Sequence, residues 1–208
     1  MNRILDESLY DPVGELSKAI LCHQSGQLKA AEKIYREILE TDPDHSDALH
    51  LLGVIAHQSD KNKDAVELIS QAIQINPGDP NYYNNLGAAL RNQGRLNEAI
   101  AAYQKALRIK SDYAGAYNNI GNVFREQGRL DEAVTAYQNA IRLEPDFLKA
   151  YNNLGITLKE QGRPEEAISC YQRAVQIKPD YAQSYDKIEC GTATCKFRNT
   201  LKHAERDR

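Results

Sequence analysis

The chain has 208 residues, and its 29 acidic and 26 basic side chains are interspersed to give a net charge of −3. This balance excludes the basic face that is typical of nucleic-acid-binding proteins. No apolar run is long enough to span a membrane, and residues 1–20 lack the apolar core of a signal peptide. We therefore expect a cytoplasmic protein with neither nucleic acid nor a membrane as its partner.

Residues 1–11 carry three apolar side chains among acidic ones: Ile4, Leu5 and Leu9. The end of a repeat array exposes apolar surface, which needs a polar cover to stay in solution. We interpret residues 1–11 as an N-terminal cap over such an array, with a disordered start as the alternative.

Residues 12–181 consist of five copies of a 34-residue unit: 12–45, 46–79, 80–113, 114–147 and 148–181. The letters Tyr-Asn-Asn-Leu-Gly, or the same run with Ile, recur from Tyr83, Tyr117 and Tyr151. Apolar and small residues spaced three and four apart predict two helices in each unit. A glycine such as Gly162 ends the first helix, and a proline such as Pro179 ends the second.

Two copies depart from this pattern at their turns. In the second copy Asp60 replaces the turn glycine, and in the third copy Ser111 replaces the final proline. Aspartate tolerates left-handed backbone better than most residues, so we expect the turn at Asp60 to survive. We expect Ser111 and Asp112 to cap the following helix and to leave this junction looser than the others.

Residues 182–208 continue the pattern for half a unit. Tyr185 and Ile188 are in register, but Glu189 stands at the position of the helix glycine. A glutamate does not fit a close contact between helices, so this helix should turn a polar face to water. We predict a C-terminal capping helix followed by a polar tail.

The repeated Leu-Gly, Tyr, Ala and Pro positions resemble the tetratricopeptide repeat, with Tyr in place of the usual Trp in three copies. The resemblance implies an all-α fold, a right-handed α-solenoid of five tandem helix-turn-helix repeats. It also implies that the first helix of each unit lines a concave groove, in which such proteins bind another protein or a peptide.

The inward positions of these first helices hold the candidate site residues. The first two copies offer an apolar patch made of Leu16, Ile20, Leu51 and Val54. The last three copies offer amide and cationic side chains: Asn84, Asn85, Asn118, Asn119, Asn122, Asn152, Asn153, Arg91, Arg125 and Lys159. An apolar patch on a protein surface usually marks a contact surface. Three covers fit it: a bulky side chain of a ligand, the segment 1–11, or another copy of the protein.

Asn85, Asn119 and Asn153 stand at one position of three successive copies. An asparagine amide both donates and accepts, as a peptide unit does. We expect these residues to form a ladder that pairs with the backbone of an extended peptide. The alternative is that the amides are solvated or form hydrogen bonds between helices.

The Asn-rich units are also similar to the repeat arms of O-linked N-acetylglucosamine transferases and their SPINDLY relatives. This resemblance implies an alternative function, the substrate-recognition arm of such a glycosyltransferase, although too few residues follow residue 181 to form its catalytic domain. Asn122 and Asn153 match the carboxylate clamp of chaperone-binding members, and Lys187 could replace its arginine. Asn118 and Gln183 stand where that clamp needs lysine.

Enzymatic chemistry has little support in the sequence. His23, His50 and His57 lie on the first helices of two copies, but no cysteine or carboxylate completes a zinc site, so we interpret them as solvated groove residues. Cys190 and Cys195 have neither metal-binding nor redox spacing. No nucleophile motif or phosphate loop is present, and we expect neither an enzyme nor a metal or other cofactor.

Overall fold

The structure, a computed structural model, describes residues 12–178. In these residues it contains ten α-helices and no strand. The chain divides into two compact units, Met1–Ile109 and Lys110–Arg208. The segments expected to cap the array, residues 1–11 and 182–208, lie outside the described residues, as do the last three residues of the fifth copy.

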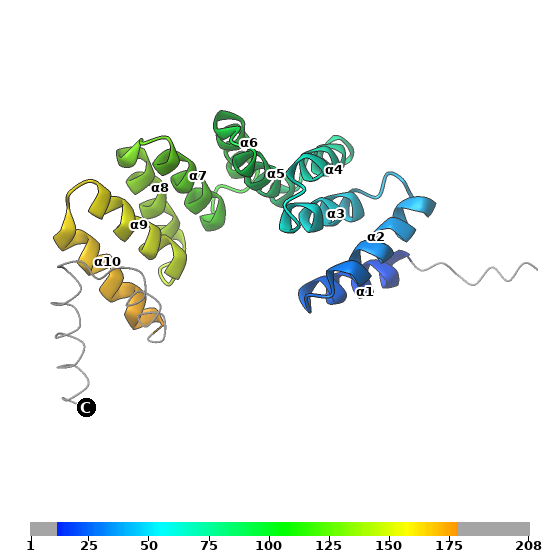
Figure 1. The fold of residues 1–208 in the computed structure, drawn as a ribbon, viewed down its shortest axis with the longest axis horizontal. Coiled ribbons are helices and arrows are strands. Elements are labelled where there is room, and N and C mark those ends of the chain that lie inside the picture. The colour runs from blue at the N-terminus through cyan, green and yellow to red at the C-terminus, as the bar shows by residue number, and fades with distance from the viewer. Residues whose placement is uncertain (1–11, 179–208) are drawn as a thin grey trace, which may run out of the picture. The chain divides into compact units, whose positions relative to one another are not determined.

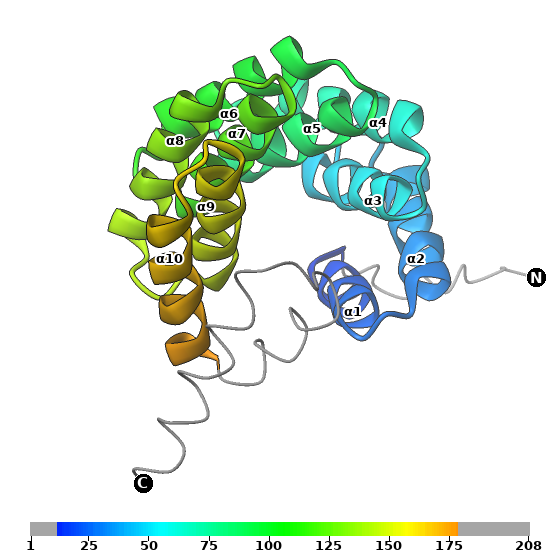
Figure 2. The same ribbon diagram turned by 60° about the vertical axis from the view of Figure 1, so that its left-hand side comes forward.

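The described part of the first unit is made of helix pairs. Its helices are α1 (Pro12–Gln24), α2 (Leu28–Thr41), α3 (Ser46–Gln58), α4 (Asn62–Ile75), α5 (Pro80–Asn92) and α6 (Leu96–Ile109). Each helix packs against the next one along the chain, and α5 also contacts α3 (Figures 1 and 2). This is the arrangement of three stacked helix-turn-helix repeats, in which every repeat contacts its neighbours.

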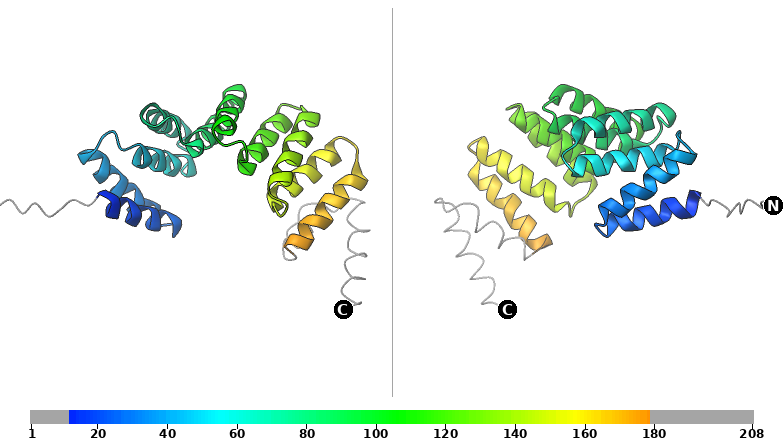
Figure 3. Two further views of the ribbon diagram at one scale, coloured as in Figure 1. Left: turned by 180° about the vertical axis from the view of Figure 1, so that it is seen from behind. Right: turned by 45° about the vertical axis from the view of Figure 1, so that its right-hand side comes forward.

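The second unit repeats the same arrangement. Its described helices are α7 (Ala114–Glu126), α8 (Leu130–Leu143), α9 (Leu148–Glu160) and α10 (Pro164–Ile177). Consecutive helices again pack together, and the first helices of the two repeats, α7 and α9, touch each other (Figure 3). Both units are therefore stretches of an all-α solenoid, as the sequence predicts.

The turn between the two helices of each repeat has left-handed backbone at one residue. These residues are Gly26 (φ 78°), Asp60 (φ 57°), Gly94, Gly128 and Gly162 (φ 73° each). Glycine adopts this conformation without a steric cost, which explains its recurrence every 34 residues. The expectation that Asp60 preserves the turn of the second repeat is confirmed.

In the third and fourth repeats a glycine of the first helix lies against a tyrosine of the second helix. A Cβ atom on Gly121 would lie 2.6 Å from the Tyr137 ring, and Gly87 has the same relation to Tyr103. Both tyrosines are buried, with 0% and 1% of their surface exposed for Tyr137 and Tyr103. The glycine is thus needed because the ring occupies the space of a side chain.

The start of α7 differs from the expectation. Its N-cap is Tyr113, which makes no side-chain capping bond, so the prediction that Ser111 and Asp112 cap this helix is wrong. By contrast, the Asp79 carboxylate caps α5 by accepting a hydrogen bond from a backbone N–H of the first turn. A tyrosine hydroxyl is too far from its own backbone to act in this way. The first turn of α7 uses backbone acceptors instead: the N–H groups of Ala114 and Ala116 donate to the carbonyl oxygens of Asp112 and Tyr113.

We expect the amides of residues 110–117 to exchange with solvent faster than those at the other repeat junctions. Ser111 replaces a proline there, and Gly115 weakens the first turn of α7; α9 also lacks a side-chain cap but follows Pro145. Hydrogen exchange measured by NMR would show this difference, and Ser111→Pro should slow the exchange. Equal protection at all four junctions would contradict the expectation.

Candidate functional site

The apolar patch of the first unit lies on α1 and α3. Leu16, Ile20, Leu51 and Val54 are all half-buried. Leu16 and Leu51 also pack against the buried cluster that includes Tyr35. Leu16 and Leu51 therefore serve the core of the first unit in part, and all four side chains keep some exposed surface.

A buried histidine joins α3 to α5 in the same unit. His50 is 7% exposed, and its Nε2 lies 2.8 Å from Nδ2 of Asn85, which donates the hydrogen bond. The ring of Tyr82 packs on the imidazole at a centroid distance of 4.5 Å. Burial lowers the pKa of His50 to about 4, although the nearby carboxylates of Asp79 and Asp47 act in the opposite direction. His50 is thus a neutral part of the interior, which corrects its interpretation as a solvated residue.

The other two histidines from the sequence analysis bond to amide side chains. Nε2 of His23 lies 3.1 Å from Oε1 of Gln58, and Nδ1 of His57 lies 2.7 Å from Oδ1 of Asn62. In residues 12–178 no group of three or more His, Cys, Asp or Glu side chains is placed to hold a metal ion.

The second unit contains a network of three asparagines and a tyrosine. Nδ2 of Asn153 on α9 donates to Oδ1 of Asn118 (2.9 Å) and to Oδ1 of Asn122 (3.0 Å), both on α7. The hydroxyl of Tyr137 donates to the same oxygen of Asn122 at 2.9 Å. Two donors thereby fix the orientation of the Asn122 amide and leave its NH₂ group pointing away from them.

This network bears on the expected ladder. Asn118 is only 5% exposed, whereas Asn119, Asn122 and Asn153 are half-buried. Asn153 forms hydrogen bonds with the preceding repeat, as Asn85 does with His50 in the first unit. The interhelical hydrogen bonds that the sequence left open as an alternative are therefore present, and contact with a ligand is left to the half-buried amides.

Two further asparagines complete the amide groups of the two units. Nδ2 of Asn84 donates to Oδ1 of Asn85 at 3.4 Å. Asn152 is half-buried, and its Oδ1 is inaccessible and accepts no hydrogen bond from residues 12–178. A buried acceptor without a donor costs free energy, so this oxygen of Asn152 lowers the stability of the fold.

The three cationic candidates differ in what they contact. Arg125 on α7 forms an ion pair with Glu160 on α9, with 3.1 Å between its guanidinium and the carboxylate. Arg91 is half-buried and Lys159 is exposed, and both already have interaction partners. Such partly exposed pairs contribute little to stability, so they remain available for exchange with a charged ligand.

The tyrosine of the second helix has different partners in different repeats, which the sequence analysis missed. Tyr35 occupies the position of Tyr137, but its buried hydroxyl has no hydrogen-bond partner within the described residues. The residue equivalent to Asn122 in the first repeat is Ile20, which offers no acceptor. Comparing these two positions between copies would have revealed the pairing.

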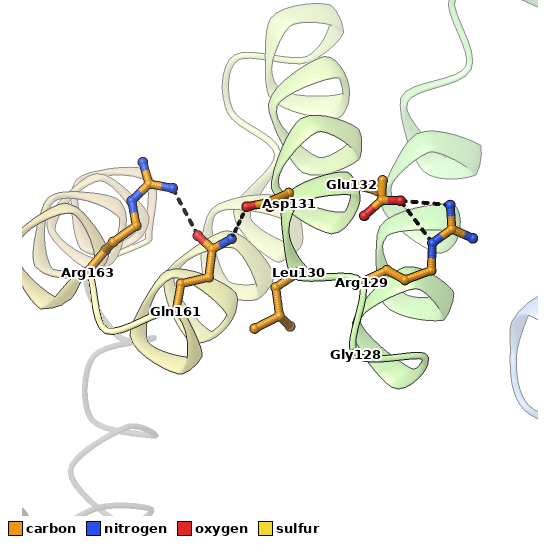
Figure 4. A pocket seen from close by; sticks show the side chains of 7 residues that line it. All are labelled: Gly128, Arg129, Leu130, Asp131, Glu132, Gln161 and Arg163. Atoms are coloured by element: carbon orange, nitrogen blue, oxygen red, sulfur yellow. Dashed lines mark hydrogen bonds and ion pairs between the residues drawn. The ribbon is translucent and has the colours of Figure 1, made fainter.

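A hollow on the turn side of the second unit is bordered by side chains that contact one another. Its volume is about 500 Å³, and its lining includes Arg129, Asp131, Gln161 and Arg163 (Figure 4). Gln161 donates to Asp131 at 2.7 Å and accepts from Arg163 at 2.9 Å. Arg129 pairs with Glu132 at 2.8 Å. Every charged group of the lining has a partner. We therefore interpret the contacts around this hollow as ones that hold the fourth and fifth repeats together.

The described residues contain two cysteines. Cys22 and Cys170 are both free and half-buried. Burial, with a smaller effect of Glu166, raises the pKa of Cys170 to about 11. A thiol with this pKa is not ionised at neutral pH and is a weak nucleophile.

The described helices are too short or too polar for any of them to cross a bilayer.

These observations define a helical repeat protein with half-exposed amide and apolar side chains on its first helices. Sequence models of the tetratricopeptide repeat match residues 23–90 and 148–181, and a model described as TPR repeat matches 89–124 and 121–162. The chain belongs to the tetratricopeptide repeat family. No curated protein matches it.

Several solved structures share the fold. One is a crystal structure of MamA, with 26% identity, a TM-score of 0.68, and coverage of 79% of this chain and 96% of that chain. Another is YrrB, described as a TPR protein with an unusual peptide-binding site (22% identity, TM-score 0.63, 86% and 93% coverage). A third is TTC0263, a thermophilic TPR protein from Thermus thermophilus (22% identity, TM-score 0.73, 85% and 98% coverage).

Proposed function

We propose that this protein is a scaffold that binds another protein or an extended peptide through the first helices of its repeats. The observation that carries the proposal is the recurrence of half-buried amides at one position of successive repeats, at Asn85, Asn119 and Asn153. Regularly spaced groups that donate and accept match the regularly spaced peptide units of an extended chain. The description of YrrB as peptide-binding supports the same reading of a similar fold.

The strength of such binding sets a requirement on the ligand. Three hydrogen bonds to the amide ladder contribute about 0.5–1.5 kcal/mol each, which gives roughly 2–4 kcal/mol. That free energy corresponds to an affinity of about 1 mM or weaker. Apolar side chains of the ligand must add the rest, and the patch of Leu16, Ile20, Leu51 and Val54 is the surface that suits them.

We place this binding in a reducing compartment such as the cytoplasm, because the two described cysteines are free thiols. The protein needs no cofactor for this role and acts without enzymatic chemistry of its own. The glycosyltransferase arm implied by the resemblance uses the same surface, but no contact or distance in the described residues favours it over a general scaffold.

The function can be tested by selecting peptides from a random library displayed on phage with the full chain as bait. The bound peptide should shift the NMR signals of α3, α5, α7 and α9 more than those of α4, α6 and α8. Peptides that contact only the second helices, or a library from which nothing is enriched, would contradict the proposal.

Self-association through the apolar patch is the competing use of that surface. If a second copy covers the patch, Leu51→Asp should convert an oligomer to a monomer in size-exclusion chromatography. If a peptide covers it, the same change should leave the elution volume unaltered and weaken binding of the selected peptide. The two outcomes assign the patch to one partner or the other.

A further inference from the structure

A second hollow in the second unit lies between the first turn of α7 and the loop that leads into α9. Its volume is about 460 Å³, many times the roughly 30 Å³ that one water molecule occupies. It is lined by Gly115, Asn118, Asn119, Glu144, Asp146, Phe147, Leu148 and Lys149. The hollow thus adjoins the amide network but reaches beyond it toward the α8–α9 loop.

The same crevice in the first unit, between the second and third repeats, is filled by a tyrosine of the chain itself. Tyr82 is 1% exposed, and its ring packs on His50 with 4.5 Å between centroids. Its hydroxyl donates to the carboxylate of Asp47 and contacts the hydroxyl of Ser46 at 3.2 Å. An aromatic ring therefore fits the space between the first helices of two successive repeats, with a carboxylate to receive its hydroxyl.

The fourth and fifth repeats lack the groups that fill this space. Two repeat lengths after Asp47, His50 and Tyr82 stand Gly115, Asn118 and Ala150. Ala150 is buried and has no ring to offer, and Gly115 has no side chain; the ring of Tyr113 comes nearest to it, 3.2 Å from where a Cβ atom would lie. The packing of Tyr82 between the second and third repeats thus indicates which kind of side chain such a crevice accepts.

The lining supplies the partners that a tyrosine needs. Phe147 and Leu148 are half-buried and present apolar surface to a ring. Glu144 is exposed and has no ion pair in residues 12–178, so its carboxylate can accept a hydrogen bond from a phenol, as Asp47 does. Lys149 also lines the hollow, and an ammonium group can lie over the face of a ring.

We propose that this hollow binds an aromatic side chain, preferably that of a tyrosine, from the protein or peptide that the repeats hold. The inference rests on the proposed function and adds a side-chain preference to it. The ring lies against Phe147 and Leu148, and its hydroxyl donates to Glu144. Asp146 pairs with Arg173 at 3.4 Å, so Glu144 is the carboxylate of the lining that has no ion pair within residues 12–178.

The hollow can be tested without knowing the natural ligand, by NMR titration of the full chain with N-acetyl-L-tyrosinamide. The probe should bind weakly and shift the backbone amides of Gly115, Asn118 and Phe147. It should bind more tightly than the phenylalanine and leucine analogues, and Glu144→Gln should remove its advantage over phenylalanine. Equal binding of tyrosine and leucine probes, or shifts confined to other helices, would overturn the proposal.

Filling the hollow gives a second test. Gly115→Leu should reduce binding of the tyrosine probe by about tenfold or more, equivalent to about 1.4 kcal/mol. A Cβ at this position meets the Tyr113 ring at 3.2 Å, so helix content must be measured by circular dichroism. Glu67→Leu, an added leucine on the exposed face of α4, is the matched control and should not change binding. Unaltered binding by a folded Gly115→Leu protein would contradict the assignment.

The two proposals fail separately. If a selected peptide binds through the amide ladder but ignores Gly115→Leu and Glu144→Gln, the scaffold function stands and the aromatic subsite is wrong. If the tyrosine probe occupies the hollow but no peptide binds along the first helices, the subsite stands and the extended-peptide function is wrong.

Discussion

Replacing Tyr137 by alanine should lower the free energy of unfolding by about 3–5 kcal/mol, as large-to-small aromatic changes in cores do. Tyr137 is fully buried, packs against Gly121 and lies in the cluster that contains Leu154 and Leu158 of the next repeat. Removing the ring therefore leaves unfilled space both within the fourth repeat and between the fourth and fifth repeats. Urea unfolding followed by far-UV circular dichroism would measure the change.

Phenylalanine substitutions separate the ring from the hydroxyl. Tyr137→Phe removes the hydrogen bond to Asn122 and should cost about 0.5–1.5 kcal/mol. Tyr35→Phe removes a buried hydroxyl that has no partner in the described residues, so it should be neutral or stabilising. Equal losses at the two positions would show that the Asn122 contact contributes nothing. Tyr171→Ala should lower the free energy of unfolding by less than Tyr137→Ala does, because Tyr171 is only half-buried.

Stability should fall by about 3 kcal/mol through His50 alone as the pH is lowered from 7 to below 4. Its pKa is lowered from the usual 6.5 to about 4 by burial, and each pKa unit corresponds to about 1.4 kcal/mol. Between these two values the unfolded chain binds a proton that the folded chain does not, so stability rises with pH in this window. The contribution is complete above pH 6.5 and is lost progressively toward pH 4.

A matched variant isolates this effect from the titration of carboxylates. His50→Asn places at this position the residue that the third, fourth and fifth repeats carry there, at Asn84, Asn118 and Asn152. The difference in unfolding free energy between the two proteins should change by about 3 kcal/mol from pH 7 to pH 4. A difference that is constant with pH would mean that His50 is accessible to solvent and protons in the folded state.

The repeat period predicted the fold because it is written in every copy. The first helices begin at Pro12, Ser46, Pro80, Ala114 and Leu148, each 34 residues after the last. The left-handed turn residues and the Asp79 cap also follow from local chemistry. The N-cap of α7 was predicted wrongly, because a Ser or Asp that precedes a helix does not by itself show which residue becomes the N-cap.

The site was harder to predict, because side chains of neighbouring repeats decide which inward residues remain accessible. Asn118 and Asn119 are adjacent in sequence, yet Asn118 is buried under Asn153 and Asn119 is half-buried. Tyr82 stands where the second, fourth and fifth repeats have alanine and the first has glycine, and its packing on His50 depends on a pair that occurs once among the described repeats. Periodicity gives the average repeat, and the functional differences lie in departures from it.

The central claim is that the half-buried amides of the first helices hold a peptide backbone. The most direct measurement is the affinity of a library-selected peptide for the protein in which Asn85, Asn119 and Asn153 are all alanine. We predict binding weaker by about tenfold or more, equivalent to about 1.4 kcal/mol, with unchanged helix content. The matched control replaces Asn97 and Asn139, which lie on second helices, and should bind as the unmodified protein does. Equal affinity of the triple variant and the unmodified protein would contradict the claim.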